Sequence, residues 1–101
     1  MFRLIGTMKI KPEKIAQWEE IITRRREQVL RDEDFTLVYD FYRSAIDPCE
    51  YVVIEGFADE SGHERHLQQS IGHEAMIECF AAPPTLQKLW PVKNCTSDSD
   101  T

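Results

Sequence analysis

The stretch FTLVYDFYRSAIDPCEYVVIEGFADE, residues 35–60, decides the fold. Two runs rich in aromatic and β-branched residues, 35–42 and 51–57, flank a turn-forming segment at 45–48, and this pattern predicts a β-hairpin. Because successive side chains of a strand point to opposite faces, each run divides into two sets. One face of the hairpin carries Phe35, Leu37, Tyr39, Phe41, Tyr51, Val53, Glu55 and Phe57. The opposite face is also largely apolar, with Val38, Tyr42, Val52 and Ile54. Both faces of the sheet therefore need a cover.

The segment before the hairpin predicts a strand followed by a helix. Residues 2–10 alternate between apolar and polar positions as a strand does. Pro12 suits a first helical turn, and residues 13–30 carry the apolar stripe of an amphipathic helix, with Trp18 predicted in the core. The basic run 24–26 is flanked by glutamates, which predicts an exposed face of this helix.

The segment after the hairpin predicts a second helical region and a last strand. Asp59 is a typical N-cap. The inward stripe of the helix that follows is unusually polar, with His63, His66, Leu67 and Ser70. We expect a bend near Gly72, a continuation over 73–80 and an end at two consecutive prolines, because proline cannot continue a helix. Residues 85–92 then form a short strand.

The predicted order of elements is βαββαβ, which is the α+β ferredoxin-like plan with a four-stranded antiparallel sheet. One layer of helices covers one face of such a sheet. The natural cover for the second apolar face is another copy of the chain, so a homodimer is expected. Residues 1–93 are predicted to form a single domain, and residues 94–101 a disordered acidic tail.

Composition excludes several classes of partner and site. The chain has 101 residues, a net charge of −6 and no basic patch, which argues against nucleic acid and anionic membranes as partners. We expect no signal peptide and no transmembrane helix. The three cysteines show no metal-binding or disulfide-type spacing, so we expect a cytoplasmic protein without a metal or other cofactor.

The order of several short motifs resembles a known family. These motifs are Tyr39, Arg43-Ser44, Asp47-Pro48, Tyr51, Glu55, Phe57, Asp59, His66, Pro83-Pro84 and Pro91-Val92. Together they are similar to the antibiotic biosynthesis monooxygenase (ABM) domain, within the dimeric α/β-barrel superfamily. The resemblance runs from Phe2 to Val92. It implies a cofactor-independent oxidation of a small aromatic, quinol-like or polyketide-like substrate by molecular oxygen.

Some positions depart from the pattern of the family. Relatives usually have tryptophan where this chain has Phe57, and the haem-degrading branch has asparagine near the position of Gly6. The resemblance therefore argues against haem breakdown. Two alternatives to oxygenation stay open, namely a non-catalytic small-molecule-binding or stress-related module and an isomerase on the same scaffold, although we favour an enzyme.

The candidate site combines the inward face of the hairpin with the polar helix stripe. His66 is the predicted general base, because an imidazole titrates near neutral pH, and Glu55 is predicted to orient it. The resemblance places both at the positions of the family's strand glutamate and helix histidine. The predicted substrate-binding residues are Tyr39, Tyr51, Phe57, His63 and Trp90. Structural roles are open for each of them, including a buried ion pair of Glu55 with His66 or Arg43.

Overall fold

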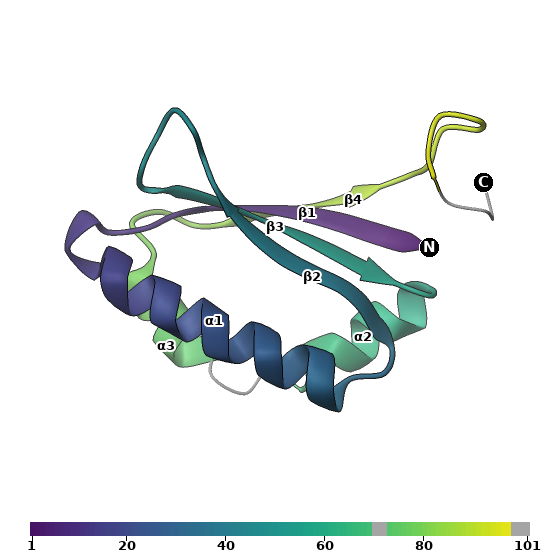
Figure 1. Cartoon of the computed structure of the whole chain (residues 1–101), viewed down its shortest axis with the longest axis horizontal. Helices are drawn as coiled ribbons and strands as arrows, with labels where there is room; N and C mark the ends of the chain where they lie inside the picture. Colours follow the sequence, from purple (N-terminus) through teal and green to yellow (C-terminus); the bar gives the residue numbers. More distant parts are fainter. Residues whose placement is uncertain (70–72, 98–101) are drawn as a thin grey trace.

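The computed structural model describes residues 1–69 and 73–97. The elements are β1 (Phe2–Lys9), the 3-10 turn η1 (Pro12–Lys14), α1 (Ile15–Asp32), β2 (Thr36–Arg43), β3 (Glu50–Phe57), α2 (Glu60–Gln68), α3 (His73–Cys79) and β4 (Thr85–Leu89). The strands form one antiparallel sheet in the order β2-β3-β1-β4. Helices α1, α2 and α3 lie on the same face of it (Figure 1). The predicted α+β ferredoxin-like fold is confirmed.

The core lies between the sheet and α1. Trp18 is completely buried there, and its ring packs against the rings of Phe41, Tyr51 and Phe80 at centroid distances of 6.4, 6.0 and 5.7 Å. Trp18 thus joins α1 to two strands and to the residue that follows α3. The expected core role of Trp18 is confirmed.

A β-bulge corrects the predicted alternation of the first hairpin strand. Thr36 pairs with Phe57 and Val38 with Gly56, so one extra residue is inserted between Thr36 and Val38. The extra residue, Leu37, is 50% exposed instead of facing the core. The bulge also turns Thr36 toward the helices, where its hydroxyl donates a 2.8 Å hydrogen bond to Glu33 Oε1.

Helix α1 buries a charge that the sequence interpretation placed in solvent. Arg25 is only 5% exposed. It follows Ile22 by three residues and Trp18 by seven, so it continues the buried stripe of the helix. Arg24 stays at the surface and pairs with Glu20. The prediction that the whole basic run is exposed is therefore wrong for Arg25.

The second half of the chain follows the predicted order with shorter elements. Asp59 caps α2, because its carboxylate accepts a 3.1 Å hydrogen bond from the Gly62 N–H. Strand β4 ends at Leu89, earlier than predicted. The expected inward position of Ser70, the bend at Gly72 and the last residues of the expected tail, 98–101, lie outside the described residues.

The outer face of the sheet carries no helix in the part of the chain that the structure describes (Figure 1). Ile5 and Ile54 pair at its centre and are partly exposed.

Cys49, Cys79 and Cys95 are free thiols. Among the described residues, no helix has the length and apolar character needed to cross a membrane.

Replacing Trp18 by alanine is expected to reduce the free energy of unfolding by about 3–5 kcal/mol, because the cavity left between α1 and the sheet cannot collapse fully. Urea unfolding followed by circular dichroism measures this. Ile46→Ala is the control, since Ile46 lies at the hairpin tip and is 94% exposed. Equal effects of the two substitutions would contradict this description of the core.

Candidate functional site

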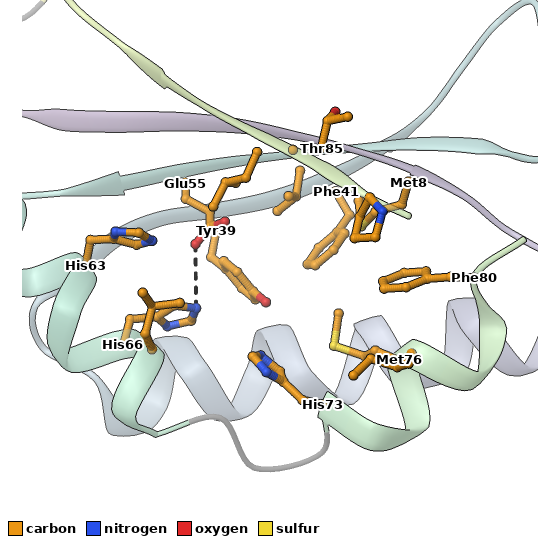
Figure 2. A pocket seen from close by; sticks show the side chains of 16 residues that line it. Met8, Tyr39, Phe41, Glu55, His63, His66, His73, Met76, Phe80 and Thr85 are labelled. Carbon is orange, nitrogen blue, oxygen red and sulfur yellow. Dashed lines mark ion pairs between the residues drawn. The ribbon is translucent and has the colours of Figure 1, made fainter. Parts of the chain in front are cut away.

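A cavity of about 290 Å³ lies between the covered face of the sheet and helices α2 and α3 (Figure 2). Polar groups lie toward the α2 end, where Glu55, His63 and His66 line the wall. The α3 end is apolar, with Met8, Phe41, Met76 and Phe80. Such a cavity suits a small, mostly apolar molecule whose few polar atoms are fixed at one end.

His66 lies between two buried carboxylates. Its Nδ1 is 2.6 Å from Glu33 Oε1, and its Nε2 is 3.5 Å from Glu55 Oε1 (Figure 2 shows the second contact). A carboxylate only accepts hydrogen bonds, so the contact with Glu33 places a proton on Nδ1. The Nε2 atom is then the one that faces the cavity side and can exchange a proton there.

Glu33 holds His66 because its own position is fixed on both sides. It follows α1 directly, and its backbone N–H donates a 2.9 Å bond to the Val29 carbonyl. Its Oε1 also accepts the hydroxyl hydrogen bond of Thr36, which the β-bulge turns inward. The sequence gives no signal for Glu33, since it lies between elements, with Asp32 and Asp34 on either side, and shares no face with His66 in any periodic pattern.

The environment of Glu55 favours its neutral form. Burial raises the pKa of Glu55 above its ordinary value, and the positive charges of His66 and Arg25 oppose this increase. Glu33 adds to the increase as a like charge. Ionisation of Glu55 is thus opposed by burial and by Glu33, and it is favoured by the positive charges of His66 and Arg25.

Tyr39 presents a hydroxyl to the same cavity. The Arg25 Nε–H donates a 3.1 Å hydrogen bond to the phenol oxygen, so the tyrosine proton is directed elsewhere. Burial raises the pKa of Tyr39 to about 12, which keeps the phenol protonated at neutral pH. The terminal guanidinium nitrogen of Arg25 also lies 3.4 Å from His73 Nε2. Tyr39 can thus donate a hydrogen bond to a negative oxygen in the cavity.

His63 lines the cavity one helical turn before His66. Its ring lies between the rings of Phe2 and Phe57, at centroid distances of 5.8 and 5.3 Å. Burial lowers the pKa of His63, and the positive charges of His66 and Lys88 lower it further. The imidazole is therefore neutral at neutral pH.

The structure brings together Glu55, His66, Tyr39 and His63, four of the predicted site residues. The other three lie outside the cavity lining. Tyr51 packs on Trp18 and donates a hydrogen bond to Glu19 at the other end of the sheet face. Phe57 is fully buried behind both imidazoles, and Trp90 is 69% exposed with its ring edge against Phe2.

A cluster of metal ligands is not part of this site. Among residues 1–69 and 73–97, no three His, Cys, Asp or Glu side chains are arranged to hold a metal ion. His73 illustrates this, since its Nε2 faces the Arg25 guanidinium, whose positive charge opposes a bound cation.

The fold and the cavity define a class of protein, the small α+β proteins of ferredoxin-like plan with a site between the sheet and its helices. The model of one family within that class, antibiotic biosynthesis monooxygenase, matches residues 1–78. The chain therefore belongs to the antibiotic biosynthesis monooxygenase family.

Solved structures share this fold. A protein from Caulobacter crescentus CB15, provisionally described as an antibiotic biosynthesis monooxygenase, is 26% identical with a TM-score of 0.81, covering 90% of this chain and 89% of that one. One from Nitrosomonas europaea with the same provisional description is 20% identical with a TM-score of 0.83, covering 91% and 99%. Rv0793 from Mycobacterium tuberculosis is 19% identical with a TM-score of 0.79, covering 94% and 98%. No curated protein matches the chain significantly.

Replacing Glu55 by glutamine is expected to change how stability depends on pH. The pKa of Glu55 is raised on folding, so its stabilising contribution is full below its ordinary value of 4.5 and is lost as the pH rises through the folded value. Glutamine cannot ionise. The stability of Glu55→Gln relative to the unsubstituted protein should therefore increase between pH 4 and pH 8.

Urea unfolding at a series of pH values measures this difference. The control is Glu64→Gln, an exposed position on the helix that carries His66. The difference in the free energy of unfolding between Glu64→Gln and the unsubstituted protein should not change with pH. If the free energy of unfolding of Glu55→Gln changes with pH in the same way as that of the unsubstituted protein, burial does not disfavour the ionised carboxylate.

Proposed function

We propose that the protein is a cofactor-independent monooxygenase that oxidises a small aromatic, quinol-like or polyketide-like substrate with molecular oxygen. The observation that carries this proposal is the orientation of His66. Glu33 holds Nδ1, and Nε2 faces Glu55 at the polar end of a cavity whose other end is apolar. This is the geometry of a general base in a dry site.

The first step of the proposed reaction is removal of a proton from the substrate by His66 Nε2. The resulting phenolate or enolate is electron-rich and transfers one electron to oxygen, and the two radicals then combine into a peroxide. The peroxide takes the proton back from His66, and the resulting hydroperoxide loses water together with the hydrogen of the oxidised carbon. A carbonyl group is left on that carbon. One oxygen atom of O₂ thus enters the product and the other leaves as water, so no external reductant is consumed.

The remaining polar groups assist this step. Glu55 stabilises the imidazolium that forms when His66 takes the proton, and the Tyr39 hydroxyl donates to the negative oxygen of the substrate. Phe41, Met76 and Phe80 surround the aromatic body at the other end and keep water away. We place this activity in the cytoplasm, where free thiols remain reduced.

Replacing His66 by glutamine is expected to lower the rate of oxygen consumption by about 100-fold or more, the usual contribution of a general base. An oxygen electrode measures the rate with metal-free protein and a panel of quinols and anthrones. Glu33→Gln should reduce the rate less and change its pH profile, because it weakens only the group that orients the base.

Other results would assign a different function. Thermal stabilisation by these compounds without oxygen uptake would indicate a non-catalytic binding module. Product formation without oxygen would indicate an isomerase. An unchanged oxygen-uptake rate in His66→Gln would rule out His66 as the base.

The proposed functional unit is a homodimer that pairs the outer faces of two sheets. Ile5 and Ile54 form the apolar centre of that face, and burying them against a second copy removes apolar surface from water. Both faces of the sheet are then covered, one by the helices and the other by the second copy.

Replacing Ile54 by lysine is expected to convert the dimer into a monomer, because it places two positive charges in the interface without partners. Light scattering coupled to size-exclusion chromatography measures the mass. Leu30→Lys is the matched control on the solvent side of α1 and should leave the dimer intact. An unsubstituted protein that is monomeric at micromolar concentration would contradict the pairing.

A further inference from the structure

His63 contributes a polar atom to the cavity wall that the proposed proton transfer does not use. Its side chain is only 7% exposed, and its Nε2 has no hydrogen-bond partner among the described residues. Figure 2 shows the ring pointing from α2 into the cavity, beside Glu55. A buried nitrogen without a partner costs free energy, so an uncharged apolar ring would suit this wall better unless a ligand completes the hydrogen bond.

The surroundings of His63 identify the kind of atom that would complete the bond. Phe2 and Phe57 flank the ring, Lys88 contributes a positive charge nearby, and Glu60 and Glu64 contribute opposing negative charges. The net effect favours the neutral imidazole. A neutral ring nitrogen either donates or accepts according to its tautomer, and a hydroxyl group can satisfy both forms.

His63 and His66 are three residues apart on α2, so their Cβ atoms are about 5–6 Å apart and their side chains are neighbours on one face. Both rings also lie against the Phe57 ring, at 5.3 and 5.6 Å between centroids. A ligand whose hydroxyl reaches His66 Nε2 therefore brings the adjacent edge of its ring toward His63.

We infer that His63 Nε2 binds a second oxygen substituent of the substrate, so the substrate class is an aromatic compound with two hydroxyl groups on neighbouring carbons. This inference rests on the proposed function, which places an aromatic substrate in the cavity with one hydroxyl at His66. His66 takes the proton from that hydroxyl, and His63 recognises the other. The two imidazoles thus have different tasks, proton transfer for His66 and substrate selection for His63.

The test compares two probes that differ by one hydroxyl group, 2,3-dihydroxynaphthalene and 2-naphthol, and measures their binding by titration calorimetry under nitrogen. The unsubstituted protein is expected to bind the diol about tenfold more tightly, the usual contribution of one buried hydrogen bond. His63→Phe should bind both probes equally, because phenylalanine keeps the packing against Phe2 and Phe57 but removes the nitrogen. Its melting temperature in the absence of ligand should rise.

His73→Phe is the matched control, because His73 also lines the cavity but has Arg25 as a partner. It should keep the preference for the diol. Three results would overturn the inference: equal or undetectable binding of both probes by the unsubstituted protein, a preference that persists in His63→Phe, or a lower melting temperature with equal loss of both affinities.

The experiment separates this inference from the proposed function. Binding under nitrogen requires no turnover, so a preference for the diol that depends on His63 can hold even if no substrate consumes oxygen. Conversely, oxygen uptake that depends on His66 but shows no preference for neighbouring hydroxyls would support the proposed oxygenase function and contradict the proposed role of His63.

Discussion

The contact between Glu33 and His66 connects the residue that follows α1 to the last turn of α2. Both side chains are buried, and removing one partner of a buried pair typically costs about 3–5 kcal/mol. The bulge at Leu37 supports the same contact, because it turns Thr36 inward to hydrogen-bond with Glu33. The β-bulge in β2 therefore helps to orient the imidazole of His66 through Thr36 and Glu33.

The charges around this contact balance when His66 is protonated. Arg25 contributes one positive charge, whereas Glu33 and Glu55 contribute two negative charges when both are ionised, so a neutral His66 leaves one carboxylate without a counter-charge. Burial raises the pKa of Glu55, and the like charge of Glu33 raises it further. When His66 takes a proton, the cluster becomes electrically neutral with both carboxylates ionised.

The sequence predicted the sheet and its covered face because alternation and helical stripes are local signals. It also predicted that Glu55 and His66 face each other, since both follow from those signals. It could not predict which part of the long face borders the cavity. Tyr51 shares the face of Glu55, but its end of the sheet is filled by Trp18. Glu33 was missed because its burial depends on His66, which lies far away in the chain. Arg25 lies on the buried stripe of α1, but a charged side chain is usually exposed, and its partner Tyr39 is also distant in the chain.

The cavity lies where the two shorter helices, α2 and α3, cover the sheet. Helix α1 has 18 residues and packs with Trp18, whereas α2 and α3 have only 9 and 7 residues, and the inner stripe of α2 is polar. Leu67, Ile77 and Leu86 line the cavity and are also about half exposed, so its rim is apolar. In the proposed complex this rim and the apolar walls would exclude water from the polar contacts with Tyr39 and the imidazoles. Hydrogen bonds in such low-dielectric surroundings are stronger than the same hydrogen bonds in water.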